Sequence, residues 1–220
     1  MSLAIAAVIF DLDGVLVDTE IWWDEVRQAF AAAHDRPWTV QDRASVMGAN
    51  SRQWSRTMRE RLRLDTPASD IERAVVEAMV LRWRTGPSPL IPGADLVVAR
   101  LAGEYPLAVA SSAHRDVIDA ALTITGLRSC FTVVVSSDEV GHGKPAPDVY
   151  LEAARRLGVA PQRCVVVEDS LNGVLSGRAA GMSVVLVPNG SIPPAPGARE
   201  AAHVVLADIR DFDPRQIALS

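Results

Sequence analysis

The sequence has 220 residues, a length that allows one substantial core and a smaller inserted domain. Hydrophobic residues make up 49% of it and charged residues 22%, which is typical of a folded soluble protein. The formal net charge of −5 argues against nucleic-acid binding, and no segment reaches the roughly 18 apolar residues of a membrane span. Cys130 and Cys164 lack metal-type spacing, so we expect reduced thiols in a cytoplasmic protein. The oligomeric state stays open, and a monomer is compatible with the sequence.

The first predicted element is a buried strand over Ala4–Phe10, an apolar run that ends at Asp11. Asp13 and Gly14 follow, so the chain turns directly after the strand. Side chains of an extended backbone alternate in direction, and Asp11 and Asp13 can therefore take different tasks. One carboxylate can attack phosphorus, while the other protonates a leaving oxygen and later activates water.

The segment between Asp18 and Leu90 contains no strand-like run and has a helical pattern. All five tryptophans lie in it, and we expect most of them to fill the core of a small helical domain. Glycine and proline cluster over residues 86–93, which is typical of a linker. The predicted helices are Trp22–Ala33, Arg52–Leu62 and Ile71–Arg84.

From residue 107 onward, strand-like and helical patterns alternate, which predicts an α/β fold with a parallel sheet. We therefore expect a Rossmann-like core domain of residues 1–16 and 91–220, with helices on both faces of its sheet and an α-helical cap domain of residues 17–90 inserted into it. The later predicted strands are Leu107–Ala110, Phe131–Val135, Cys164–Val167, Val184–Val187 and a weak one at His203–Leu206. The helices predicted between them are Asp116–Thr125, Pro147–Leu157 and Leu171–Ala180.

Polar residues follow the predicted strands, at the sheet edge where ligands bind in open α/β folds. Ser111 and Ser112 follow the second strand and precede a helix, where a hydroxyl and free backbone N–H groups can cradle a phosphate. An ordinary serine N-cap is the alternative. Lys144 is the single lysine among 22 basic residues and lies in the loop after the third strand, so we expect its ammonium to neutralise a phosphate oxygen and a carboxylate together.

Acidic residues at the same edge predict a metal site. Glu168 and Asp169 end the fourth strand and join Asp11 and Asp13 as oxygen donors. A carboxylate that attacks a phosphate dianion needs a cation between the two charges. Oxygen ligands without histidine or cysteine favour Mg²⁺ over zinc. For Asp169 the alternative is a cap of the helix that follows.

Four segments, in order and spacing, closely resemble the four motifs of the haloacid dehalogenase superfamily. The resemblance is strongest to the group with a helical cap between the first two motifs, which contains β-phosphoglucomutase-like and phosphoglycolate phosphatase-like enzymes. The four segments are Phe10–Glu20, Ala110–Ser112, Gly143–Asp148 and Val167–Gly173.

The resemblance implies that Asp11 forms an aspartyl-phosphate and that Asp13 is the general acid and then the base. It implies that Mg²⁺ is held by the Asp11 carboxylate, the Asp13 backbone carbonyl and Asp169, with Glu168 close by or bound through water. The presence of Asp13 disfavours the dehalogenase branch, which lacks a second acidic residue at this place.

The phosphate-binding pair of the family maps onto Ser111 and Lys144, and the implied activity is a phosphatase of a small phosphorylated metabolite. A phosphosugar mutase is the alternative, although Trp23 stands where the mutases carry a cap histidine. Arg52 is the one residue that we can place as a cap grip for a second phosphate, and Trp23 is a candidate floor of the substrate pocket. A phosphate-binding module without turnover is a third hypothesis.

Overall fold

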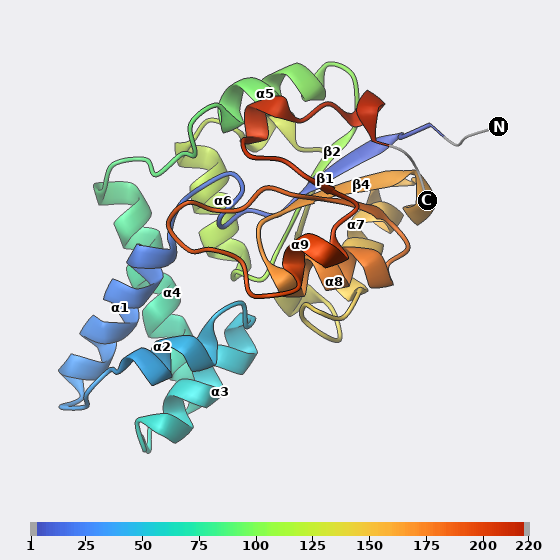
Figure 1. The fold of residues 1–220 in the computed structure, drawn as a ribbon. Coiled ribbons are helices and arrows are strands. Elements are labelled where there is room, and N and C mark those ends of the chain that lie inside the picture. The colour runs from blue at the N-terminus through green and yellow to red at the C-terminus, as the bar shows by residue number, and fades with distance from the viewer. Residues whose placement is uncertain (1–3, 218–220) are drawn as a thin grey trace.

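A computed structural model describes residues 4–217 and contains one six-stranded sheet (Figure 1). The strand order is β3-β2-β1-β4-β5-β6, and all neighbouring strands are parallel. The chain builds one side of the sheet with β2 and β3 and returns to the other side of β1 with β4, so the order reverses between β1 and β4. The strands are β1 Ala7–Phe10, β2 Leu107–Ser111, β3 Val133–Ser136, β4 Cys164–Glu168, β5 Ser183–Leu186 and β6 Val204–Val205.

Both faces of the sheet are covered, which explains the continuous apolar runs of its strands. Val8 and Phe10 point to one hydrophobic cluster, and Ala7 and Ile9 point to the other, because successive side chains of a strand alternate. Helices α5 and α6 contribute to the first cluster and α7, α8 and α9 to the second, so the predicted α/β fold is confirmed. These helices are α5 Ala94–Ala102, α6 Arg115–Ile124, α7 Asp148–Leu157, α8 Leu171–Ala179 and α9 Ala198–Ala201.

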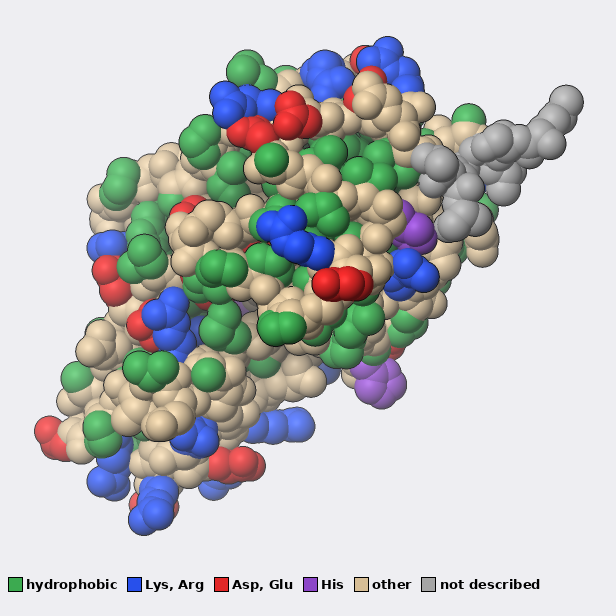
Figure 2. Space-filling model, in the orientation of Figure 1, with side chains coloured by type: hydrophobic (Ala, Val, Ile, Leu, Met, Phe, Trp, Pro, Cys, Tyr) green, Lys and Arg blue, Asp and Glu red, His purple; other side chains and the backbone are tan. Residues whose placement is uncertain are grey.

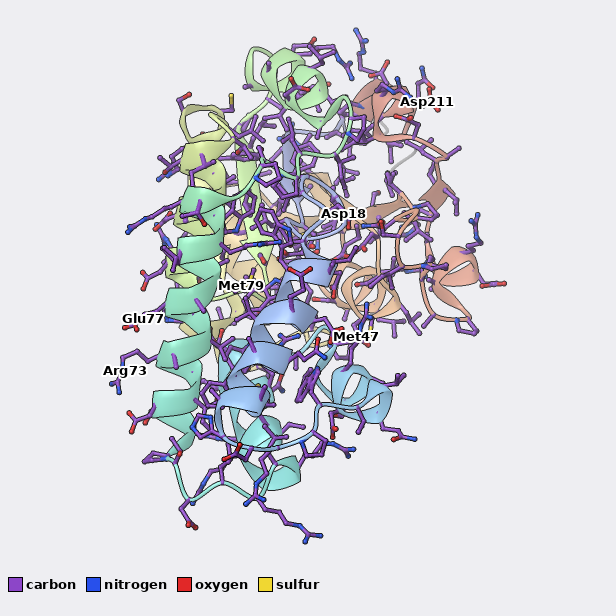
Figure 3. All side chains as sticks on the ribbon, turned by 90° about the vertical axis from the view of Figure 1, so that its left-hand side faces the viewer. Asp18, Met47, Arg73, Glu77, Met79 and Asp211 are labelled. Carbon is purple, nitrogen blue, oxygen red and sulfur yellow. The ribbon has the colours of Figure 1, made fainter. Side chains whose placement is uncertain are left out.

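Four helices between β1 and α5 form the lobe beside the sheet in Figure 1. Tryptophans fill it: the rings of Trp22 and Trp83 lie 5.2 Å apart, and those of Trp23 and Trp54 lie 6.3 Å apart. Figure 3 shows Met79 pointing from α4 toward α1 inside this lobe. The helices are α1 Glu20–Ala33, α2 Val40–Val46, α3 Ser51–Arg61 and α4 Ala68–Thr85.

The two ends of this helical lobe lie side by side. Val17 and Leu90 form an antiparallel bridge. Asp18 N donates to Pro89 O at 2.8 Å, and Ile91 N donates to Leu16 O at 2.9 Å. The lobe therefore joins the rest of the chain through one short two-stranded connection, and the division at residues 16/17 and 90/91 stays a prediction.

Three of the described helices were absent from the sequence-based expectation: α2, α5 and the four-residue α9. Helix α2 has few apolar residues and is held by a capping box, in which Thr39 and Asp42 bond to each other's backbone. Helix α5 buries Ala94, Val97 and Leu101, a helical spacing that its position after the proline-rich linker obscured.

For the other helices and strands, the observed ends differ from the predicted ends by at most three residues. The third strand begins at Val133 rather than Phe131, because a 3-10 turn at Arg128–Cys130 precedes it. The first strand begins at Ala7 rather than Ala4. The weak last strand is present as the two residues of β6. Cys164 is buried and Cys130 is half-buried, and both are free thiols.

Figure 2 shows acidic and basic side chains interspersed over the face in view. Within residues 4–217, no helix combines the length and the apolar character needed to cross a bilayer.

Candidate active site

Asp11 follows β1 directly and lies at the point where the strand order reverses, where open α/β sheets bind ligands. Its backbone N–H donates to Val167 O at 3.0 Å, which fixes the residue beside the end of β4. The side chain lines a cavity of about 250 Å³ between the strand ends and the helical lobe. Burial raises the pKa of Asp11 to about 8, although the Lys144 ammonium opposes the shift.

Lys144 is the centre of a buried hydrogen-bond network. Its Nζ lies 2.6 Å from Asp11 Oδ1, 2.6 Å from Glu168 Oε1 and 3.1 Å from Ala110 O. These three acceptors match the three donors of an ammonium. Burial alone would lower the pKa of Lys144, but Asp11 and Glu168 outweigh it and hold the pKa above its usual range. The predicted contact between Lys144 and a carboxylate is therefore present.

Glu168 is fully buried, and its carboxylate accepts five hydrogen bonds. Lys144 and the Tyr150 hydroxyl, at 2.7 Å, donate to Oε1. The Asp169 N–H, the Ser170 N–H and the Ser170 hydroxyl donate to Oε2. A carboxylate offers about four lone-pair sites, so Glu168 is saturated and orients Lys144. Its predicted contact with a metal stays a prediction.

Asp13 turns its carboxylate away from Lys144 and toward the helical lobe. The Thr19 hydroxyl donates to Asp13 Oδ1, and the Trp23 indole N–H donates to the same oxygen at 3.3 Å. Oδ2 accepts no hydrogen bond from the described residues. Burial raises the pKa of Asp13, which favours the protonated carboxyl despite the two donors.

Asp169 completes a set of three carboxylates whose oxygens lie within 4.8 Å of one another, together with Asp11 and Glu168. Among the residues that the structure describes, nothing donates a hydrogen bond to the Asp169 side chain. Burial, with Glu168 and Asp11 adding repulsion, raises its pKa well above the usual range. A divalent cation would relieve this repulsion, and an all-oxygen donor set fits Mg²⁺.

Ser111 and Ser112 line the same cavity at the end of β2. The buried Ser111 hydroxyl accepts a hydrogen bond from Ala113 N at 3.0 Å. Helix α6 has His114 as its N-cap, so neither serine is the ordinary helix cap that we kept as an alternative. Both hydroxyls therefore lie where a phosphate could meet them, and their role stays a prediction.

The lobe contributes a different set of residues from the one expected. Trp23 lines the cavity as predicted, but Arg52 is exposed in the first turn of α3 and lies outside the cavity wall. Two charged residues that we did not predict, Glu20 and Arg27, line the cavity instead. Arg27 stands four residues after Trp23 on α1, and this helical spacing was a usable signal.

A loop near the C-terminus forms the outer wall. Residues 192–195 line the cavity, and Ser191 Oγ donates to Asp18 Oδ2 at 2.5 Å. Asn189 Nδ2 donates to the other Asp18 oxygen at 3.4 Å. Figure 3 shows Asp18 where α1 meets the C-terminal loops, and Met47, which lines the cavity, lies on the same side of α1. No motif in the sequence marked this loop.

Comparison with known proteins finds relatives over most of the chain. The model of the haloacid dehalogenase-like hydrolases matches residues 5–181. The chain is 32% identical over 219 residues to hexitol phosphatase B of Escherichia coli (strain K12), covering 94% of this chain and 91% of that protein. It is similar to the crystal structure of CbbY from Rhodobacter sphaeroides in complex with phosphate, with a TM-score of 0.83, 27% identity, and 97% and 100% of the two chains covered. It is also similar to a putative β-phosphoglucomutase from Thermotoga maritima, with a TM-score of 0.71, 29% identity, and 94% and 96% covered.

Proposed function

Because this chain belongs to the haloacid dehalogenase-like hydrolases, we propose that it is a magnesium-dependent phosphatase of a small phosphate monoester. The proposal rests on one observation: Asp11 and Asp13 lie in the same turn but have different hydrogen-bond partners. Burial raises the pKa of both carboxyls, but Asp11 contacts the Lys144 ammonium, which opposes the shift, whereas Asp13 receives two neutral donors. Such a division suits one carboxylate as nucleophile and the other as acid.

In the first step, an Asp11 oxygen attacks phosphorus, and the bond between phosphorus and the ester oxygen breaks. Asp13 passes the proton on its carboxyl to the leaving oxygen, so the alcohol departs neutral. Oδ2 of Asp13 suits this transfer, because Thr19 and Trp23 already donate to Oδ1. The product on the protein is an aspartyl-phosphate at Asp11.

In the second step, Asp13 takes a proton from water, and the water oxygen attacks the aspartyl-phosphate. Inorganic phosphate leaves, and Asp11 and Asp13 return to their starting states. Lys144 keeps its place through Glu168 and can stabilise the charge on the phosphoryl oxygens, together with the Ser111 hydroxyl. A bound Mg²⁺, held by Asp11, Asp169 and the Asp13 carbonyl, would supply the positive charge that lets a carboxylate approach a phosphate.

The test is phosphate release. Purified protein with Mg²⁺ is assayed against sugar phosphates, sugar-alcohol phosphates, phosphoglycolate and nucleotides, beside Asp11→Asn. We expect release from at least one monoester by the wild type and none above background by Asp11→Asn. Equal rates for both proteins, or no release from any substrate, would contradict the proposal.

A phosphosugar mutase is the second candidate, supported by the similarity to the putative β-phosphoglucomutase. A mutase has to hold a bisphosphate in two orientations, and Arg52, the expected second grip, lies outside the cavity. Incubation with β-glucose 1-phosphate and a bisphosphate primer separates the two activities. Glucose 6-phosphate without phosphate release would select the mutase.

A further inference from the structure

Arg27 is a cation inside the cavity that the reaction as proposed does not use. It is only 7% exposed, and it lines the cavity on α1. Its guanidinium Cζ lies 4.9 Å from the centre of the Trp23 ring and 5.4 Å from that of Trp54. The two indoles therefore hold the guanidinium without using its hydrogen-bond donors.

Those donors have no acceptor within the described part of the chain: no hydrogen bond or ion pair reaches the Arg27 guanidinium, and its Nε is buried without a partner. Arginine is almost never buried unless it is paired. Burial lowers the pKa of Arg27 to about 10, so the group remains a cation at neutral pH. The Arg27 guanidinium is thus buried, charged and flanked by two indoles, and its N–H donors lack a hydrogen-bond acceptor from the described residues.

The acidic groups around Arg27 do not fill this gap. Asp13 is bound by Thr19 and Trp23, and Asp24 accepts the Trp38 indole N–H at 2.9 Å and faces Arg43 at 3.5 Å. Glu20 shares the cavity wall but lies beyond ion-pair distance of Arg27.

We infer that Arg27 binds a second anionic group of the substrate, a carboxylate or phosphate at the end remote from the scissile ester. A guanidinium presents a planar fork of donors that matches two oxygens of such a group, and burial strengthens the contact. Trp23 links the two ends of the site, since it donates to Asp13 and stacks on Arg27. The inference rests on the proposed phosphatase activity and narrows its substrate class to monoesters with an anionic tail.

A purely structural Arg27 would behave differently. If it served only to support the two tryptophans or to offset Glu20, its removal would affect all substrates alike. If it binds an anionic tail, its removal affects only substrates that carry one. The ratio of kcat/KM between matched substrates separates the two roles, because a general loss cancels in the ratio.

The assay compares pairs that differ in the charge of the tail: 3-phosphoglycerate with glycerol 3-phosphate, 6-phosphogluconate with glucose 6-phosphate, and fructose 1,6-bisphosphate with fructose 1-phosphate. We expect the wild type to prefer the anionic member of at least one pair by tenfold or more in kcat/KM. Arg27→Gln should bring that ratio close to one, mainly by raising KM for the anionic member, and Arg27→Lys should retain part of the preference. Arg52→Gln, an exposed arginine of the same lobe, is the matched control and should keep the wild-type ratio.

A binding measurement keeps the inference testable without turnover. Calorimetry compares 3-phosphonopropanoate with propylphosphonate, neither of which can be hydrolysed, on the wild type and on Arg27→Gln. Tighter binding of the carboxylate that depends on Arg27 would support the inference even if no monoester were hydrolysed, in which case the phosphatase proposal alone would fail. Equal binding of both phosphonates, or equal kcat/KM within every pair, would overturn the inference and leave the phosphatase proposal standing.

Discussion

The backbone of Gly14 lies against the Asp169 carboxylate, so closely that a Cβ atom on Gly14 would meet Asp169 Oδ2 at 2.0 Å. Gly14 also has a φ of +87°, which residues with a side chain rarely adopt. Asp169 can therefore approach the turn that carries Asp11 and Asp13 only because residue 14 has no side chain.

We therefore expect Gly14→Ala to lower phosphatase kcat/KM by at least about 100-fold, because Asp169 must move from the other carboxylates. Gly126→Ala is the matched control, since Gly126 also has a positive φ but meets nothing within 4 Å. It should cost about 1–2 kcal/mol of unfolding free energy and leave kcat/KM near the wild-type value. A similar loss of activity in both variants would point to backbone strain instead of contact with Asp169.

Asp13→Asn keeps the shape of the side chain but removes the acid and the base. We expect the rate of phosphate release to fall by about 10²- to 10⁴-fold. Substrates whose leaving alcohol is acidic, such as p-nitrophenyl phosphate, need less protonation and should still phosphorylate Asp11. Mass spectrometry after a rapid quench should then detect a longer-lived aspartyl-phosphate in the variant than in the wild type. An unchanged rate of phosphate release would assign the acid to another residue.

The end of each parallel strand could be predicted from the sequence, and this explains why Asp11, Lys144, Glu168 and Asp169 were expected together. The carboxyl ends of parallel strands lie at one edge of the sheet, so the residues directly after β1 and β4 converge, whereas Lys144 lies beyond the 3-10 turn Ser137–Glu139 and reaches the site through its loop. The helices of the lobe share no such edge, so a cavity-facing side chain can be predicted there only from its helical spacing to another one. Arg27 lies four residues after Trp23 on α1, but this spacing was not used, and Arg52 was expected in the site instead.

Tyr150 was also missed, because nothing in an α7 pattern of buried residues marks a hydroxyl that reaches Glu168. Tyr150→Phe leaves a buried carboxylate without one of its donors, and we expect it to lower the unfolding free energy by about 1–3 kcal/mol. Denaturant unfolding measures this. Tyr105→Phe, whose hydroxyl has no hydrogen bond among the described residues, should change stability by less than about 0.5 kcal/mol. Equal effects would mean that the bond to Glu168 is not the cause.

Asp42 links α2 to α3, because it accepts hydrogen bonds from Thr39 and from the Arg61 guanidinium. The Thr39 bonds and Arg61 hold the pKa of Asp42 below its usual value. A carboxyl with a lowered folded-state pKa stabilises the fold above its unfolded pKa of about 3.9, and this contribution is lost as the pH falls through the lower folded value.

Asp42→Ala should therefore cost about 1 kcal/mol near pH 7, and the difference from the wild type should shrink below about pH 4. Urea unfolding at pH 7, 5 and 3.5 measures the difference. Asp70→Ala, which removes an exposed pair with Arg73, should cost less at pH 7. A difference that stays constant over this pH range would argue against the ionised carboxylate as the source.

Ser191 holds the outer wall of the cavity to Asp18. We expect Ser191→Ala to raise KM about tenfold with kcat little changed, because a hydrogen bond to a carboxylate contributes about 1.5 kcal/mol and no reacting group is lost. Steady-state kinetics on the best monoester measures the split. Ser88→Ala is the control, because Ser88 is exposed and precedes Pro89, the backbone partner of Asp18, and it should leave KM unaltered. A fall in kcat alone would mean that the loop acts on the chemical step.

The short connection at Val17 and Leu90 has a consequence for how such a chain can diversify. The backbone enters the lobe at Asp18 and leaves it at Pro89, and Asp18 N donates a hydrogen bond to Pro89 O at 2.8 Å. The rest of the chain is therefore attached to the lobe at two adjacent positions, whatever segment lies between them. A loop of a few residues or a larger helical bundle could be grafted there while Asp11 and Lys144 kept their contact, so substrate choice can be exchanged if the new segment replaces Thr19 and Trp23 as donors to Asp13.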